Sequence, residues 1–226
     1  MRILCLSDTH GYHERFKIDE TVDVVVHTGD FSNSYGKNNI YETEEFLSWF
    51  NSLNVKYKIL VAGNHDTYFE ELSKKGGIDA VKDFLSLDYP NIIYLQDSNI
   101  SINGVNFYGT PWCPIYYDWA FMVDDDYQKM MFSKIPDDAN ILLTHTPAHG
   151  ILDYSNGTLC GSTPLLNRIQ EIKSLGNLKY HIFGHIHMDE GNSKEHVGTN
   201  EKTDYIAVNA CNINYLGFYE PIIIEI

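Results

Sequence analysis

Five apolar stretches of this 226-residue chain each end in a short polar loop that carries Asp, His or Asn. The stretches are residues 2–6, 22–27, 57–62, 141–144 and 180–183. Val, Ile and Leu run through them with little alternation, which is typical of strands that are covered on both faces. The pattern therefore predicts an α/β or α+β fold in which helices flank a sheet.

Helical periodicity supports this fold class. Residues 41–53 carry apolar side chains at three- and four-residue steps, and further helices are expected near residues 78–87, 125–135 and 164–175. The acidic run at residues 124–126 is expected to begin the third of these helices, because carboxylates are favoured at a helix N-terminus.

The region from residue 92 to residue 108 has a different pattern, with short alternating runs around Asn103-Gly104. This dipeptide is typical of a two-residue hairpin turn, so we expect antiparallel strands there. Strands are expected again at residues 205–210 and 221–226. Because the sequence has no internal repeat or linker, we predict one domain over residues 1–226.

The charge balance limits the partners. Sixteen Lys and Arg residues against 31 Asp and Glu residues give a formal net charge of −15. Such a surface repels DNA, RNA and anionic membranes, so neither long nucleic acid nor a membrane is an expected partner. The sequence has no apolar run of the roughly 18 residues that a membrane span needs, and its first apolar stretch is too short for a signal peptide. We expect a soluble, cytoplasmic protein.

Candidate metal ligands follow all five predicted strands. Residues two apart in an extended chain point to one side, so Asp8 and His10 after the first strand can converge on one ion. The same spacing separates His185 and His187 after the last of the five strands. The full set of candidate ligands is Asp8, His10, Asp30, Asn64, His145, His185 and His187.

Taken singly, each of these residues could be a helix cap or a core histidine. Jointly they favour a shared site, because the carboxyl ends of the strands in an open α/β sheet form the edge that binds ligands. Imidazole and carboxylate groups suit first-row ions such as Mn, Fe or Zn, and seven ligands exceed one tetrahedral site. Two metal ions that share one carboxylate would use all seven.

The motifs D-x-H, G-D, G-N-H-[DE], a single H and G-H-x-H occur here in that order, and the series resembles that of the calcineurin-like metallophosphoesterases. A closer resemblance, to the small metallophosphoesterase-domain-containing proteins of the cyclic-nucleotide phosphodiesterase branch, rests on the segments SDTHG, HTGDF, KILVAGNHD, NIIYLQDSNISINGVNFYGTPW, LLTHTPAHG, HIFGHIH, NAC and EPIIIEI. These segments span nearly the whole chain. The resemblance implies a four-layer α-β-β-α sandwich of two mixed sheets flanked by helices.

The resemblance also implies how the candidate ligands divide, with Asp30 bridging two divalent ions. The first ion is held by Asp8, His10 and His187, and the second by Asn64, His145 and His185. His65 is left without a metal, and the family uses this His to protonate the leaving alkoxide. Asp66 either orients the His65 ring or caps the following helix, and the sequence does not decide between these two roles.

The expected chemistry follows from the charges. Two divalent ions outweigh two carboxylates and a bridging hydroxide by roughly one positive charge, which attracts a phosphodiester anion. The expected reaction is in-line attack of the metal-bridging hydroxide on phosphorus. The expected cofactors are two Mn ions, with Fe or Zn as alternatives.

One departure from the superfamily limits the substrate. Its protein phosphatases extend the second motif to G-D-x-V-D-R-G, whose Arg grips a phosphomonoester, but here Asp30 is followed by Phe31-Ser32-Asn33-Ser34. Arg15 either substitutes in part or covers a helix as a surface side chain. We therefore predict a small phosphodiester substrate, and the resemblance favours a cyclic nucleotide. A phosphomonoesterase and a non-catalytic protein-binding scaffold on the same fold are the alternatives.

Some residues have open roles. Trp112 and Cys113 either line the pocket, where Trp112 would stack on a base, or pack in the core. His149 is a candidate for a contact with a ligand or the substrate. The remaining histidines are expected to be structural or exposed, namely His13, His27, His181 and His196.

Overall fold

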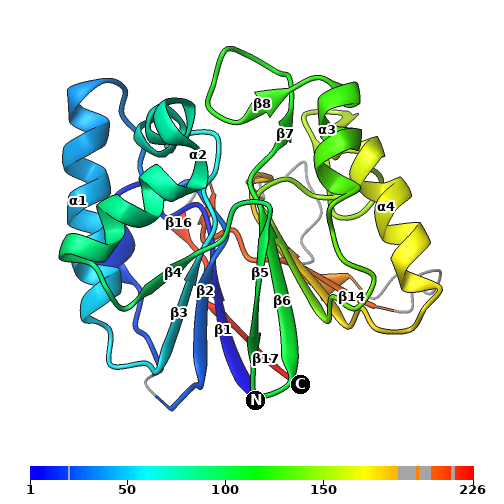
Figure 1. The fold of residues 1–226 in the computed structure, drawn as a ribbon, viewed down its shortest axis with the longest axis horizontal. Coiled ribbons are helices and arrows are strands. Elements are labelled where there is room, and N and C mark those ends of the chain that lie inside the picture. Colours follow the sequence, from blue (N-terminus) through cyan, green and yellow to red (C-terminus); the bar gives the residue numbers. More distant parts are fainter. Residues whose placement is uncertain (20, 188–196, 199–204, 215–216) are drawn as a thin grey trace.

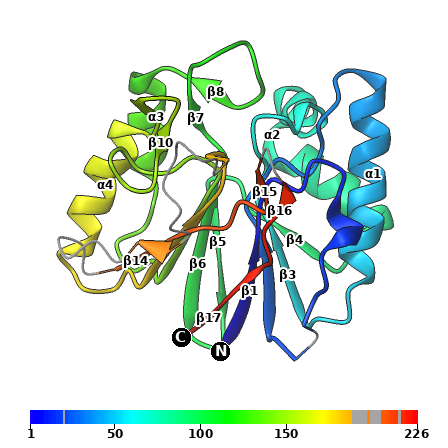
Figure 2. The same cartoon turned by 180° about the vertical axis from the view of Figure 1, so that it is seen from behind.

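The computed structural model describes residues 1–19, 21–187, 197–198, 205–214 and 217–226. Two mixed sheets pack face to face, and helices cover their outer faces (Figure 1 and, from behind, Figure 2). Helices α1 and α2 lie on one side and α3 and α4 on the other. This arrangement confirms the four-layer α-β-β-α sandwich.

The first sheet has five strands in the order β17-β1-β2-β3-β4. Strands β1 to β4 run parallel, and β17 pairs antiparallel with β1. The bounds are β1 Arg2–Leu6, β2 Val24–His27, β3 Tyr57–Leu60, β4 Ile92–Tyr94 and β17 Ile222–Glu225.

The second sheet has six strands in the order β13-β14-β12-β9-β6-β5. Its central strands are parallel, and β5 and β13 at the two ends are antiparallel to their neighbours. The bounds are β5 Ser98–Ile102, β6 Val105–Thr110, β9 Ile141–Thr144, β12 Tyr180–Phe183, β13 Val197–Gly198 and β14 Ile206–Asn209.

Helices α3 and α4 begin within one residue of the predicted starts, whereas α1 begins at Lys37 instead of residue 41 and α2 at Thr67 instead of residue 78. Asp124 accepts a hydrogen bond from the N–H of Tyr127, as expected for an acidic start of α3. The second helix is longer than predicted, and Gly76 and Gly77 interrupt it with non-helical backbone angles. The bounds are the 3-10 helix η1 His13–Arg15, α1 Lys37–Ser52, α2 Thr67–Asp88, α3 Asp125–Phe132 and α4 Thr163–Lys173.

Three short ribbons join these elements. Strands β7 and β8 pair in parallel, and the other two ribbons are antiparallel. Their bounds are β7 Cys113–Pro114, β8 Met122–Val123, β10 Tyr154–Ser155, β11 Thr158–Leu159, β15 Ile213–Asn214 and β16 Gly217–Phe218.

Successive residues of the buried strands serve different cores. In β1, Ile3 and Cys5 pack between the two sheets, whereas Leu4 and Leu6 pack under α1 and α2. This alternation is the two-residue period of an extended chain, and both sets of side chains are apolar because both faces are covered. The unbroken apolar stretches that predicted a covered sheet have this origin.

One predicted pairing is wrong. The stretch from residue 92 to residue 108 was expected to form antiparallel strands, and β5 and β6 do pair in this way across Asn103-Gly104. Strand β4, however, runs parallel to β3 in the other sheet. Three residues carry too little alternation to reveal their sheet, and β4 follows α2 as the return strand of a β-α-β unit.

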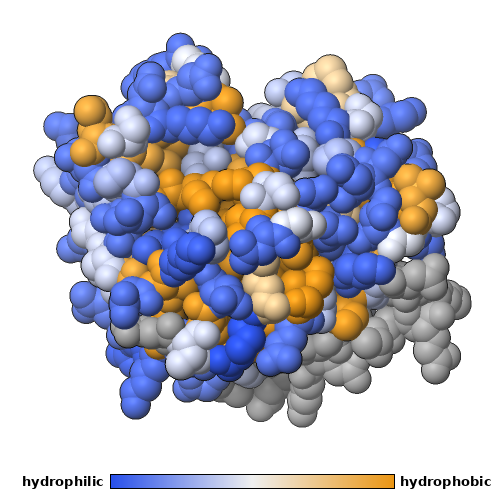
Figure 3. All heavy atoms as spheres, turned by 60° about the horizontal axis from the view of Figure 1, so that its bottom comes forward, coloured by the Kyte–Doolittle hydropathy of each residue, from blue (hydrophilic) through white to orange (hydrophobic). Residues whose placement is uncertain are grey.

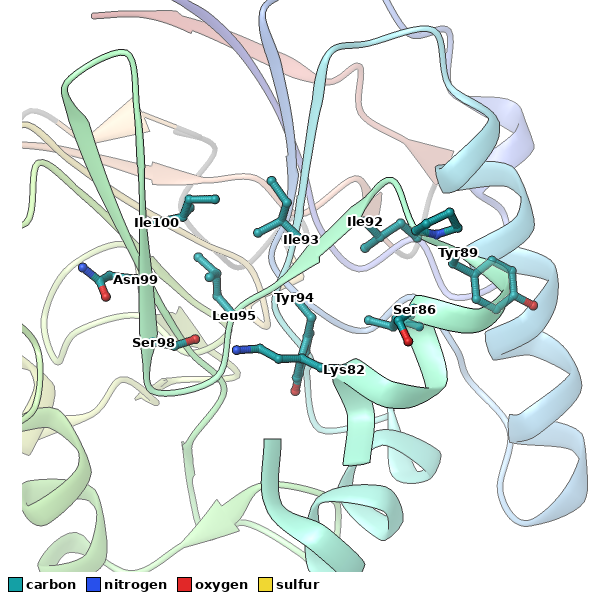
Figure 4. Close-up of a pocket in the computed structure, with 12 residues that line it drawn as sticks. Lys82, Ser86, Tyr89, Ile92, Ile93, Tyr94, Leu95, Ser98, Asn99 and Ile100 are labelled. Atoms are coloured by element: carbon teal, nitrogen blue, oxygen red, sulfur yellow. The ribbon is translucent and has the colours of Figure 1, made fainter. Parts of the chain in front are cut away.

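An open groove of about 360 Å³ lies between the last strands of the two sheets, β4 and β5, beside the end of α2. Figure 4 shows Tyr94, Leu95 and Ile100 among its lining residues, and Figure 3 shows hydrophobic side chains across the middle of one face. Among the described residues, none of the candidate metal ligands lines this groove. The candidate metal ligands therefore lie in another part of the molecule.

No helix in the described part of the chain combines the length and apolar character needed to cross a bilayer.

Candidate metal centre

The candidate ligands gather where the carboxyl ends of the two sheets meet. Ser7, just after β1, forms a bridge with Cys211, just after β14, so the two sheets are joined at this edge. The backbone N–H of His185, after β12, donates to both carboxylate oxygens of Asp8 at 3.1 and 3.0 Å. The polar loops of both sheets therefore share one site, as the sequence pattern predicts.

Asp8, His10 and His187 form one group whose ligand atoms lie within 4.8 Å of one another. The Nε2 atoms of His10 and His187 are 3.2 Å apart, and Nε2 of His187 lies 3.4 Å from the Asp8 carboxylate. Nδ1 of His10 lies 3.2 Å from the carbonyl oxygen of Ser32, which fixes the ring and leaves Nε2 facing the group. Two imidazole nitrogens and a carboxylate that converge in this way suit a divalent ion.

Asp30, His145 and His185 form a second group of the same dimensions. Nε2 of His145 lies 3.3 Å from the Asp30 carboxylate and 2.9 Å from Oδ1 of Asn64. Nδ1 of His145 lies 2.9 Å from the carbonyl oxygen of Thr28, so Nε2 is again the nitrogen turned toward the group. The structure thus brings Asn64 beside His145, one of the two histidines with which the resemblance had grouped it.

Asp30 lies between the two groups. Its Oδ2 atom is 3.3 Å from Nε2 of His145 and 3.9 Å from Nε2 of His10, and its Oδ1 atom accepts from the N–H of His65 at 2.8 Å. Asp30 also belongs to a third cluster, with His10 and His65. One buried carboxylate therefore faces histidines from both sheets, which is the position that a bridging ligand needs.

The electrostatics of the site favour a cation. Burial alone would raise the pKa of Asp30, but the charges of His145 and His65 outweigh it and hold the pKa well below the ordinary value. Burial would likewise lower the pKa of His145, but the Asp30 carboxylate raises it to about 9. The field that favours a proton on His145 favours a metal ion at the same place. The residues present therefore fit a metal centre.

Unusual backbone angles place the ligands. Four candidate ligands have positive φ, namely Asp8 at 54°, His10 at 43°, Asp30 at 56° and His185 at 67°. This left-handed region is uncommon for residues other than Gly, and such strain is concentrated at functional sites. Sharp turns after β1, β2 and β12 thus direct these polar side chains into the site. The spacing of the motifs gave no indication of these angles.

Close contact between backbone and ligands explains the glycines of the motifs. A Cβ atom at Gly184 would collide with the Asp8 carboxylate and the Ser7 hydroxyl, and one at Gly63 would collide with Oδ1 of Asp30. The neighbouring atoms belong to buried, hydrogen-bonded residues that have little room to shift.

We expect Gly184→Ala to lower metal affinity about 10–100-fold, because the added methyl group displaces Asp8 from its hydrogen bonds with the His185 N–H. Calorimetric titration with Mn measures the loss of affinity. Gly76→Ala is the control, since its new Cβ would meet only the Ala80 Cβ at 3.0 Å. Unchanged Mn affinity in the Gly184 variant would mean that the Asp8 carboxylate does not need this position.

His65 lies at the edge of the groups. Its ring meets His10 edge-on at a centroid distance of 5.0 Å, and its Nε2 atom is 4.0 Å from the Asp30 carboxylate. Its Nδ1 atom is buried and has no hydrogen-bond partner among the described residues. Asn39 Nδ2 donates to the His65 carbonyl oxygen at 2.8 Å and fixes the backbone. The ring is thus close to the ligands but less tightly engaged than His145.

Asp66 has a different role from the two that were considered. Its carboxylate caps no N–H of α2, and it makes no hydrogen bond with the unpartnered His65 Nδ1. Instead it accepts from the backbone N–H groups of Asp30, Gly63 and Ser32 at 2.9, 2.7 and 3.1 Å, and from the Ser32 hydroxyl at 2.8 Å. Burial and the nearby Asp30 raise its pKa to about 8. Asp66 therefore ties the loop after β2 to the loop after β3.

The hypothesis that Trp112 stacks on a base is not supported. Its Nε1 donates to the Asp97 carboxylate at 3.0 Å, and its ring packs edge-on against Phe121 and Tyr127. The tryptophan beside His65 is Trp119, with ring centroids 4.8 Å apart. No sequence motif marks Trp119, so its position could not be predicted.

The other residues whose roles the sequence left open contact neighbouring parts of the fold. Arg15 lies over the Phe218 ring at 4.8 Å, which matches a covering role on the surface. Cys113 is fully buried, and Nδ1 of His149 lies 3.8 Å from Asp153. Nε2 of His27 lies 3.0 Å from the hydroxyl oxygen of Thr9, the residue between Asp8 and His10 in the sequence. The two other described histidines are buried, namely His13 and His181, and His196 lies outside the described residues.

Backbone carbonyl groups complete the site. The Thr28 and Ser32 carbonyl oxygens orient the rings of His145 and His10. The carbonyl oxygen of His65 accepts a hydrogen bond from the Asn39 side chain. A carbonyl group has no signature in the sequence, so these contacts could not be predicted. Asn39 acts through its side chain, which the sequence does show. It lies on α1, outside every motif, so no pattern in the sequence assigns it to the site.

Comparisons with known proteins agree with this geometry. The profile of the calcineurin-like phosphoesterase family matches residues 1–189. Human metallophosphoesterase domain-containing protein 1 is 33% identical over 242 aligned residues, which cover 100% of this chain and 71% of the human protein. A UPF0046 protein of Caenorhabditis elegans is 34% identical over 245 residues, with 100% of this chain and 81% of that protein covered. A crystal structure with 17% identity superposes with a TM-score of 0.66 over 92% of this chain and 89% of its own, which shows a shared fold.

Proposed function

The chain belongs to the calcineurin-like phosphoesterase family, and from this premise we propose that it hydrolyses a small phosphodiester, a cyclic nucleotide, with two divalent metal ions. The observation that carries the proposal is the position of Asp30, whose carboxylate belongs to two clusters and faces histidines of both sheets.

The proposed ligands divide as the two groups do. Asp30 is shared, and we propose Mn as the metal, with Fe and Zn as alternatives. Asp8, His10 and His187 would hold the first ion, and Asn64, His145 and His185 would hold the second. When bound, two such ions supply Lewis-acid stabilisation of the phosphoryl oxygens and lower the pKa of water.

His65 is proposed as the general acid that protonates the leaving oxygen. Its ring borders the site beside His10, and its backbone is held between the Asp30 carboxylate and Asn39. Its side chain is 17% exposed, so it can reach a substrate that enters from solvent. Asp66 is proposed as a positioning residue that fixes the loop of Asp30 relative to the turn of Gly63.

The surroundings of the site favour a diester over a monoester. A monoester carries an additional negative charge, and its phosphate oxygens are well suited to bidentate hydrogen bonds from Arg. The three arginines are engaged with other groups: Arg2 with Asp19, Arg168 with Asp137 and Glu171, and Arg15 with the rings of Tyr12 and Phe218. The net charge of −15 disfavours long nucleic acid. A small phosphodiester fits both observations.

We expect the Mn-loaded protein to hold two ions per chain and to hydrolyse cyclic nucleotides faster than monoesters. Elemental analysis and anomalous scattering test the first expectation, and a screen of cyclic nucleotides, linear diesters and monoesters tests the second. A single ion, or ions bound away from Asp30, would contradict the dinuclear centre. Hydrolysis of monoesters alone would make the protein a phosphomonoesterase, and two bound ions without any hydrolysis would favour the scaffold.

A further inference from the structure

Aromatic side chains from two connections gather beside His65. The β7–β8 connection stands at the top of Figure 1 between α2 and α3, and it carries Tyr116, Tyr117 and Trp119. The Trp119 centroid lies 4.8 Å from that of His65, and Tyr117 and Tyr116 follow at 5.2 and 6.3 Å from Trp119. Tyr35, from the β2–α1 connection, lies 6.4 Å from His65.

The same turn that presents His65 also holds Trp119. The N–H of Ala120, the next residue after Trp119, donates to the Asn64 carbonyl oxygen at 3.0 Å. The N–H of Phe121 donates to the Glu70 carboxylate at 2.9 Å. The two residues after Trp119 therefore form hydrogen bonds with α2 and with the turn before it, and these bonds fix Trp119 relative to the candidate metal centre.

The outer rings are open to solvent. Tyr116 is 69% exposed, Tyr117 59% and Tyr35 55%, whereas Trp119 is partly buried between them and His65. Single exposed aromatic residues are ordinary, but these contact one another in a series that begins at the proposed acid and ends in solvent. The series forms an apolar wall on one side of the mouth of the site.

Resting on the proposed function, we propose that this wall binds the base of a nucleotide substrate, with Trp119 as the stacking residue. A general acid must reach the leaving oxygen, so the organic group attached to that oxygen lies on the His65 side of the phosphorus. In a cyclic nucleotide this group is the nucleoside. Its base is then carried toward the ring next to His65, which is Trp119.

The chemistry of the wall fits a planar base. Every nucleobase has a π face that stacks on an aromatic side chain, and such stacking tolerates different bases. The connection carries the acidic Asp118 and belongs to a chain with a net charge of −15, so an anionic lipid surface would be repelled. The wall therefore favours substrates that carry an aromatic base over substrates without one, and it does not distinguish bases by hydrogen bonds.

The test compares a cyclic adenosine phosphate with the cyclic phosphate of ribose that has no base. Trp119→Ala should lower kcat/KM for the nucleotide about 5- to 150-fold, mainly through KM, and leave the base-free substrate nearly unchanged. Trp119→Phe retains an aromatic face and should keep most of the preference. Trp112→Phe is the matched control, because Trp112 donates a hydrogen bond to Asp97 and its ring packs against Phe121 and Tyr127.

Binding provides a second measurement that does not need turnover. AMP should quench tryptophan fluorescence in the wild type and in Trp112→Phe but not in Trp119→Phe, and ribose phosphate should quench none of them. Equal losses of kcat/KM on both substrates would show that Trp119 only positions His65 and would overturn the proposal, as would a base preference that survives Trp119→Ala. If the wild type hydrolyses no phosphoester, the proposed function fails, and the AMP quench alone then supports or overturns the base site.

Discussion

Asp30→Asn should lower kcat about 10³-fold or more, and Asn64→Ala only about 10–100-fold. The Asn side chain has nearly the shape of the Asp side chain but removes the charge that faces both ligand groups. Asn64 contacts only the His145 side of the site. Steady-state kinetics at saturating Mn, with the metal content of each variant measured in parallel, provide the comparison.

The control for this pair is Asp153→Asn. Asp153 is also a buried carboxylate, and it accepts from the N–H groups of Gly150 and Gly161 at 2.9 and 2.8 Å, outside the ligand groups. Its substitution should reduce thermal stability but leave kcat of the folded protein close to the wild-type value. Equal losses for Asp30→Asn and Asn64→Ala in folded, metal-loaded protein would contradict a bridging role for Asp30.

The strands that carry the ligands could be predicted because their physics is local. Residues 2–6, 141–144 and 180–183 match β1, β9 and β12, since strands covered on both faces must be apolar throughout. Their common edge followed from the rule that ligands bind at the carboxyl ends of parallel strands. The rule alone concerns the edge of one sheet, and the meeting of Asp8 with His185 across two sheets also needed the sandwich that the resemblance implies.

The remaining features depend on contacts between distant segments. The sheet to which β4 belongs is decided by its pairing with β3, and the role of Asp66 by backbone N–H groups that lie up to 36 residues away. The position of Trp119 depends on a hydrogen bond between Ala120 and Asn64. Propensity and spacing do not contain this information. Sequence motifs therefore located the candidate ligands, whereas the residues that position them, and the aromatic wall, required the fold.

The other large effect is expected at His65. His65→Ala should lower kcat about 10²–10⁴-fold on a cyclic nucleotide, because a positioned general acid contributes a factor of this size. Both metal ions should stay bound, since the His65 Nε2 atom lies farther from Asp30 than that of His145, at 4.0 against 3.3 Å. KM should change less than kcat, because the lost proton transfer belongs to the transition state. Kinetics and elemental analysis of the same preparation measure all three quantities.

The leaving group separates acid catalysis from other roles of His65. A p-nitrophenyl phosphodiester releases p-nitrophenolate, which departs readily without a proton, so the defect of His65→Ala should shrink on this substrate. His13→Phe is the matched control, because His13 packs against Phe46 and Trp49 and belongs to none of the ligand clusters of the described residues. It should leave both substrates unaffected. A defect of the same size on both substrates, or a His65 variant that has lost a metal ion, would instead make His65 a positioning residue or a ligand within its cluster with His10 and Asp30.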